Sequence, residues 1–221
     1  VEYRAPRDLI EVGRAALNGL PAVTRLVPAQ PPPEGTALAA LWPPEAWYGA
    51  RARHLIAIGE IGPARALAAA ARNAGLGALA STLEVEIATG ERRTAGLRIV
   101  EEAAAYFTVG RRDDGRKLLE RATQVDPTNG RTWLMLADQR RIAGDLAGAE
   151  EAIARSRADA SAELAGERAM VTGQLDLARG NTAVAIEHFR EAKRASPGRF
   201  QGYLFEADAL QESRRQLTTR E

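Results

Sequence analysis

The stretch RTWLMLADQRRIAGDLAGAEEAIARS, residues 131–156, decides the fold. Each of its two halves carries apolar residues at helical spacing, and Gly144 and Asp145 lie between the halves. Glycine readily takes the left-handed backbone conformation that ends a helix, and aspartate caps the start of the next helix. The stretch therefore predicts two antiparallel helices joined by a tight turn.

The same turn recurs along the chain, with Gly59, Gly110 and Gly180 at equivalent places and Asn181 as the expected cap after Gly180. Gly110 lies 34 residues before Gly144, whereas Gly180 lies 36 residues after it, which places a two-residue insertion near DASAEL, residues 159–164. Relative to the turn glycines Gly110, Gly144 and Gly180, small residues recur at three places: seven residues before, five residues after and twelve residues after. A large apolar residue recurs nine residues after each of these glycines. In that order they are Ala103, Ala137 and Gly173; Gly115, Ala149 and Ala185; Ala122, Ser156 and Ala192; and Leu119, Ile153 and Phe189. Helices approach closely only where the crossing residues are small, so this spacing predicts stacked hairpins.

This 34-residue pattern resembles the tetratricopeptide repeat, a helix–turn–helix unit. RTWLMLADQRRIAGDLAGAEEAIARS and GQLDLARGNTAVAIEHFREAKRASPG carry the residues of that motif. The resemblance covers residues 96–199 closely and residues 45–95 more loosely. It implies an all-α fold, a right-handed α-solenoid of antiparallel helix hairpins with a concave inner face.

Three parts are expected along the chain. Residues 1–44 should hold one helix near 8–18 and a proline-rich arm, VPAQPPPEG, that is a linker, a surface strap or a ligand for another domain. Residues 45–95 should form divergent repeat-like hairpins, and residues 96–221 three to four repeats with a C-terminal capping helix. Helices are expected at 45–58, 63–73, 77–89, 92–107, 112–125, 130–142, 146–158, 163–178, 182–194 and 200–214.

Composition excludes several classes of function. The formal net charge is +1 with both signs interspersed, so no basic stripe for nucleic acid is visible. There are no cysteines, which excludes disulfides, thiolate metal sites and cysteine nucleophiles. No apolar run approaches the roughly 20 residues that a membrane span needs. The compartment stays open between cytoplasm and periplasm.

Catalytic and metal-binding patterns are also absent from the sequence. The only histidines, His54 and His188, lie on different predicted hairpins without a ligand cluster of metal-site spacing. His188 is predicted to be a structural surface residue, because it precedes Phe189 and so points away from the apolar stripe. No nucleophile, phosphate-binding or dinucleotide motif occurs. We therefore expect no enzyme activity, no cofactor and no metal.

The resemblance implies that the first helix of each hairpin lines the inner face, where an extended peptide or a helix can bind. The inner-face residues expected on this spacing are Val100, Ala104, Phe107, Arg131, Leu134, Asp138, Arg141, Glu167, Met170, Gln174, Gln201, Leu204, Asp208 and Gln211. Each of these residues is equally consistent with a solvent-exposed surface that binds no partner. The asparagines lie only at helix ends or turns, so the carboxylate clamp of one branch of the family is not carried over. The mixed charges indicate a partner of mixed polarity.

Three hypotheses follow for the function. The first is a protein-interaction scaffold that holds a peptide or subunit in a bacterial assembly for secretion, polysaccharide export or cytochrome assembly. The second is the regulatory or substrate-recruiting part of a larger enzyme such as a transferase. The third is a homo-oligomer in which the proline-rich arm docks on a neighbouring copy.

Overall fold

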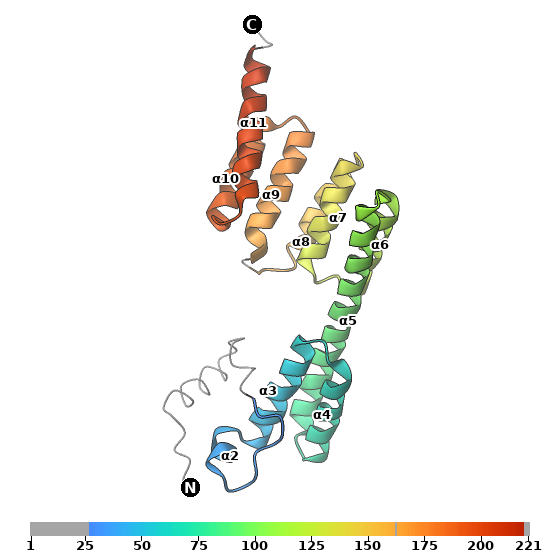
Figure 1. The fold of residues 1–221 in the computed structure, drawn as a ribbon, viewed down its shortest axis with the longest axis vertical. Helices are drawn as coiled ribbons and strands as arrows, with labels where there is room; N and C mark the ends of the chain where they lie inside the picture. Colours follow the sequence, from blue (N-terminus) through green and yellow to red (C-terminus); the bar gives the residue numbers. More distant parts are fainter. Residues whose placement is uncertain (1–26, 162, 219–221) are drawn as a thin grey trace. The chain divides into compact units, whose positions relative to one another are not determined.

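The computed structural model describes residues 27–161 and 163–218, and its regular structure within these ranges is entirely α-helical (Figure 1). The helices, labelled as in Figure 1, are α2 (Ala37–Leu41), α3 (Pro44–Ala57), α4 (Ile61–Asn73), α5 (Gly77–Thr108), α6 (Arg112–Val125), α7 (Gly130–Ile142), α8 (Leu146–Ser156), α9 (Glu163–Ala178), α10 (Thr182–Ala195) and α11 (Phe200–Thr218). The predicted helix near residues 8–18 lies outside the described residues. The short helix α2 was not predicted.

The predicted turn glycines close the helices that precede them. Gly59, Gly110, Gly144 and Gly180 have φ values of 81°, 78°, 83° and 80°, in the left-handed region. At each of them the amide of the next residue donates to a carbonyl five residues earlier, as Asp145 does to Arg140 at 2.9 Å. This hydrogen bond belongs to the Schellman motif, which satisfies carbonyls at a helix end.

The two predicted caps differ in the structure. Asp145 accepts a hydrogen bond from the Gly148 amide at 2.9 Å, so the prediction of a cap is confirmed. Asn181 holds the equivalent position before α10, but its side chain makes no capping hydrogen bond. The prediction that Asn181 caps α10 with its side chain is therefore wrong.

Gly90 does not end a helix, and the prediction of separate helices at 77–89 and 92–107 is wrong, because α5 runs unbroken through both. Gly90 is not among the glycines with positive φ. A Cβ atom at this position would lie 2.6 Å from Cγ2 of Ile56 and 3.3 Å from Cδ1 of Ile61. Glycine is needed here because other helices approach closely, not because the backbone turns.

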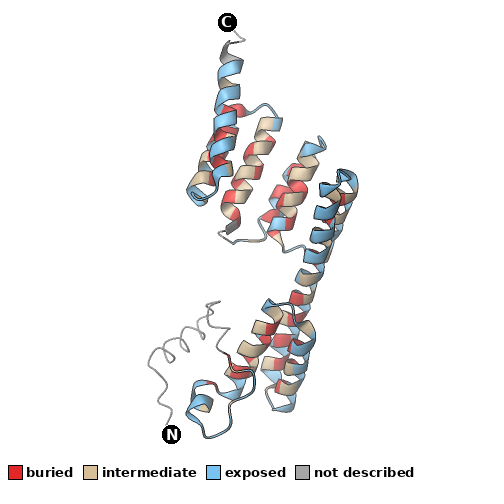
Figure 2. Cartoon of the chain, viewed as in Figure 1, coloured by how far each residue is buried: buried red, intermediate tan, exposed pale blue. Residues whose placement is uncertain are grey.

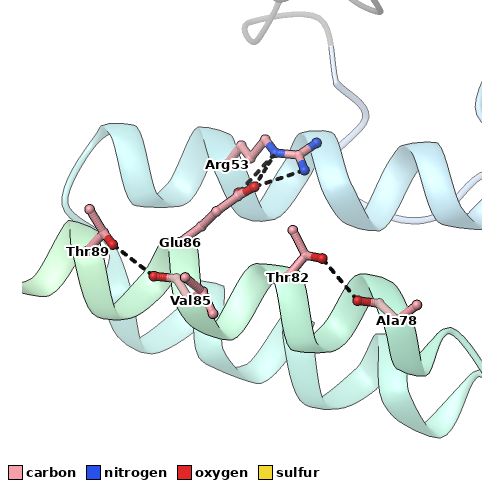
Figure 3. Close-up of polar contacts among 6 residues, drawn as sticks. All are labelled: Arg53, Ala78, Thr82, Val85, Glu86 and Thr89. Atoms are coloured by element: carbon pink, nitrogen blue, oxygen red, sulfur yellow. Dashed lines mark hydrogen bonds and ion pairs between the residues drawn. The ribbon is translucent and has the colours of Figure 1, made fainter.

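The chain divides within α5 into two compact units, one up to Thr94 and one from Ala95. In the first unit, a core that includes Ala52, Ala68 and Leu83 joins α3, α4 and α5. Arg53 on α3 holds Glu86 on α5 through two guanidinium nitrogens, at 2.9 and 3.0 Å (Figure 3). Figure 3 also shows the hydroxyls of two α5 threonines bonded to carbonyls one turn earlier in the same helix.

The start of the proline-rich arm packs against α3. Val27 and Trp42 are buried beside Trp47. The indole nitrogen of Trp47 donates to the carbonyl of Pro28 at 2.9 Å. The first residues of this arm therefore contact α3 of their own unit.

The second unit is a stack of helix hairpins, in which α7 packs on α8 and α9 packs on α10. Figure 2 shows its buried residues gathered where neighbouring helices face one another. All nine small residues and all three large residues that the repeat spacing singled out are buried. A Cβ atom at Gly115 would lie 2.4 Å from the Phe107 ring, and one at Gly173 would lie 2.6 Å from the Phe189 ring. Small residues therefore set the distance between the two helices of a hairpin, as predicted.

The two-residue insertion lies between Ser156, where α8 ends, and Glu163, where α9 begins. Arg168 on α9 donates to the hydroxyl and the carbonyl of Ser156, at 3.0 Å each, and to the carbonyl of Asp159 at 2.9 Å. One guanidinium group thus ties the end of α8 and the turn after it to α9.

Candidate peptide-binding surface

The first helices of successive hairpins lie side by side in the second unit, with α7 packed beside α9 and α9 beside α11 (Figure 1). These helices carry all the inner-face residues that the sequence predicted on residues 131–211. We call the following set the first-helix surface: Arg131, Asp138 and Arg141 on α7, Glu167, Met170 and Gln174 on α9, and Gln201, Leu204, Asp208 and Gln211 on α11. None of these side chains is fully buried.

Some predicted inner-face residues belong to the core instead. Leu134 is 1% exposed and lies in the main hydrophobic cluster of the second unit, so it is not accessible to a partner. Val100 and Phe107 on α5 are partly buried against the same cluster. Ala104 is exposed. Because α7 is packed by α6, α8 and α9, a residue one turn from the surface is enclosed on every side.

A row of three charged groups crosses the start of the three first helices. The Glu167 carboxylate on α9 lies 3.4 Å from the Arg131 guanidinium on α7 and 3.5 Å from that of Arg199, the residue before α11. Only 17% of the Glu167 side chain is exposed, whereas both arginines are about half exposed. The row therefore carries a net positive charge at its outer ends. Arg199 was missed from sequence, although it stands just before α11 as Asn129 stands just before α7.

A second ion pair lies further along α7, about two turns beyond Arg131. Nη2 of Arg141 donates to Oδ1 of Asp138 at 2.7 Å, and Nε donates to the same oxygen at 3.1 Å. Both side chains are partly buried, at 22% and 32% exposed. Arg141 is therefore held in place by its neighbour within α7 rather than extended into solvent.

Four polar residues of the first-helix surface have no such neighbour. Gln174, Gln201, Asp208 and Gln211 make no side-chain hydrogen bond or ion pair with any other described residue. Asp208 and Gln211 are exposed, and the other two are half-buried. A partner can therefore bind these groups without breaking an existing contact.

Comparison with known families finds a match for one part of the second unit. A family model described as tetratricopeptide repeat matches residues 99–138, from the last part of α5 through α6 into α7. Residues 99–138 thus match a tetratricopeptide repeat. Proteins with such repeats are generally non-catalytic and bind other proteins, so a protein-interaction scaffold is the class of function that the repeats indicate.

Among solved structures, the chain is similar to a thermophilic TPR protein in Thermus thermophilus. The two are 18% identical, the match covers 93% of this chain and 99% of that chain, and the TM-score is 0.40. No curated protein matches the chain.

The last repeat helix is joined to the rest by a buried ionic contact. Glu206 on α11 is 9% exposed and accepts hydrogen bonds from Nζ of Lys193 and, at 2.9 Å, from Nε of Arg190, both on α10. The hydrogen bond from Lys193 lowers the pKa of Glu206 most, and that from Arg190 adds to it, although burial acts in the opposite direction. The ionised carboxylate therefore stabilises the docking of α11 on α10.

Glu206→Gln should lower the free energy of unfolding at pH 7 by about 1–2 kcal/mol, because two cations then lose a charged partner. The pKa of Glu206 is lower in the folded protein than in the unfolded chain, so this contribution is complete above the ordinary value of 4.5. It is lost as the pH falls through the lowered value. Urea unfolding at pH 7 and pH 3 measures both effects.

Glu102→Gln is the matched control, because Glu102 holds the equivalent repeat position on α5 but is exposed. It should leave stability unchanged within about 0.5 kcal/mol. The two variants should therefore differ less in free energy of unfolding at pH 3 than at pH 7. If the difference stays the same at both pH values, the ionised form of Glu206 does not stabilise the docking of α11.

His188 lies close to two carboxylates on the helices that surround it. His188 on α10 has Nε2 at 3.4 Å from Oδ2 of Asp176 on α9 and Nδ1 at 3.6 Å from Oε2 of Glu191. It is 32% exposed, so it lies at the edge between the two helices. Across residues 27–161 and 163–218, no three His, Asp or Glu side chains gather as a metal site would require. In the same ranges every helix is too short or too polar to cross a bilayer.

Proposed function

We propose that this chain is a non-catalytic scaffold that binds a peptide or helix of a protein partner along the first-helix surface. We place it in a bacterial multi-protein assembly of the secretion, polysaccharide-export or cytochrome-assembly type. The observation that carries the proposal is the set of polar side chains on α9 and α11 without a partner, beside charges that are already paired. Two of these side chains, Gln174 and Gln201, are glutamines that are half-buried and open to a ligand.

The chemistry of these groups favours peptide backbone as the ligand. Each glutamine amide offers two N–H donors and one carbonyl acceptor, which can pair with the C=O and N–H of an extended chain. Gln174 on α9 and Gln201 on α11 lie on neighbouring helices. A segment lying across the helices can therefore meet both of them.

Charge favours a basic residue in the partner at one place. Asp208 is an exposed carboxylate without a counter-ion among the described residues, whereas Glu167 already has two arginines and Asp138 has one. A lysine or arginine of the partner would complete the charge balance at Asp208. Acidic groups would meet Arg131 or Arg199 at the other end of the surface, which gives the mixed polarity that the sequence predicted.

Peptides selected from a random display library on the purified chain test the proposal without a known partner. We expect enrichment of lysine or arginine at one position. Asp208→Lys should reverse that preference and weaken the selected peptides roughly tenfold, because an attraction becomes a repulsion. Gln174→Ala should weaken all selected peptides alike, since a backbone contact carries no side-chain preference.

Lys117→Glu on α6 is the control for a charge change of the same size in the same unit, outside the first-helix surface. It should leave both the enriched sequences and their affinities unchanged. Selection that enriches no peptide, or the same peptides with Asp208→Lys as with the unmodified chain, would contradict binding at this surface.

A further inference from the structure

Helix α11 is apolar on two faces. One face packs on α10, where the Phe205 ring stacks on Phe189 with centroids 5.7 Å apart and Ala209 is fully buried. The other face carries four residues, which we call the α11 stripe: Phe200, Tyr203, Ala207 and Leu210, all exposed. The exposed fractions of its three large side chains are 69%, 49% and 39%. A helix with apolar residues on opposite faces is normally covered on both.

The exposed face of α11 differs from the face expected of a C-terminal capping helix. A solvating cap presents a polar outer face. Tyr203 and Ala207 stand at the repeat positions of Trp133 and Ala137 in α7, and Ala137 is completely buried by its hairpin. The α11 stripe is thus the face that a first helix turns toward its covering helix.

An ordinary second helix of a repeat does not fit on this stripe. The first residue of the pattern is glycine in the three preceding repeats: Gly96, Gly130 and Gly166. There an added Cβ atom would lie 3.2, 2.6 and 2.4 Å from the nearest atom at the end of the hairpin's second helix or just after it. In α11 this position holds Phe200, 34 residues after Gly166. A phenyl ring would collide with a second helix placed as α6, α8 and α10 are, so the covering helix must be of another kind.

The spacing of the stripe fits a second copy of α11. Its residues are separated by three, four and three positions, so the pattern is symmetric about residue 205. In an antiparallel pair around a two-fold axis, residues at equal distances from the axis face each other. Phe200 then faces Leu210 of the other copy, and Tyr203 faces Ala207. We propose that two copies of this chain associate through their α11 stripes in this antiparallel arrangement.

Shape and charge suit this pairing. The large Tyr203 ring meets the small Ala207 on each side of the axis, which is the large-against-small packing that Phe189 and Gly173 use within a hairpin. Lys193 lies 4.7 Å from the centroid of the Tyr203 ring and helps to fix it before association. The stripe itself contains no charged residue, so its burial leaves no ion without a partner.

Sedimentation equilibrium of the 221-residue chain tests the proposal directly. We expect a reversible monomer–dimer equilibrium over about 1–200 µM, the range that reports micromolar association. Ala207→Glu should weaken the dimer at least tenfold, because a carboxylate would be buried against the Tyr203 ring of the other copy. Val184→Glu is the control, since Val184 is 50% exposed on α10, outside the stripe; it should leave the dimer unchanged.

Cross-linking tests the register, since the chain has no cysteine of its own. A mixture of Tyr203→Cys and Ala207→Cys chains should form disulfide-linked dimers faster than either variant alone. Cross-links at equal rates in the mixture and in the separate variants would overturn the antiparallel register. A chain that stays monomeric at the highest concentration would overturn the proposal itself, whatever other molecule then covers the stripe. Neither result depends on peptide binding at the first-helix surface.

Discussion

Replacing Phe189 with alanine should lower the free energy of unfolding by about 3–5 kcal/mol. Phe189 is the largest side chain that the structure buries completely. Its ring contacts Gly173 on α9 and stacks on Phe205 of α11, so it joins three helices through one side chain. Alanine would leave a cavity that the surrounding helices cannot fill. Urea unfolding followed by circular dichroism measures the loss.

Phe200→Ala is the matched control, because it removes the same ring from a position that is 69% exposed. At concentrations where the chain is monomeric, it should change stability by less than about 0.5 kcal/mol. Hydrogen exchange should place the loss caused by Phe189→Ala in α9, α10 and α11, since each repeat contacts only its neighbours. Equal losses for the two variants would contradict the assigned core.

Local chemistry explains why the turns could be predicted from sequence. A glycine ends a helix through its own backbone conformation alone. The residue after it caps the next helix by bonding to an amide within the first turn of that helix. Gly144 and Asp145 therefore stand out in the sequence and behave as expected in the structure. The spacing of small residues was equally readable because the same packing recurs three times.

Gly90 shows where such local reasoning fails. In sequence it resembles the turn glycines, yet its role depends on Ile56 and Ile61, which are about 30 residues away along the chain. Contacts between distant segments leave no signal at the glycine itself. One packing signal was available but missed: Gly96, Gly130 and Gly166 lie fourteen residues before the turn glycines, and all three are glycine.

The sequence predicted which helices carry the candidate residues, but not how those residues pair with one another. The repeat spacing placed Arg131, Glu167 and Asp208 on first helices that do lie side by side. The spacing did not predict which ion pairs form, because this depends on which charged side chains the fold brings close together. Glu167 is paired on both sides, whereas Asp208 is not. Only the structure distinguishes the paired Glu167 from Asp208.

Gly130→Ala should lower the free energy of unfolding by about 2–3 kcal/mol, although alanine normally stabilises a helix relative to glycine. The added Cβ atom would lie 2.6 Å from Cβ of Asp159 and 2.8 Å from the backbone carbonyl oxygen of Ser156. A backbone atom at the end of α8 cannot move aside as a flexible side chain can. The amide of Gly130 also donates to Oδ2 of Asp159 at 3.3 Å, and the displacement would lengthen this bond.

Gly77→Ala is the control that separates packing from propensity. Gly77 is also the first residue of its helix, α5, but no heavy atom lies within 4 Å of the position of its added Cβ. Gly77→Ala should leave stability unchanged or raise it by up to about 1 kcal/mol. Equal changes in the two variants would mean that helix propensity, rather than the close approach of α8, sets the requirement for glycine at position 130.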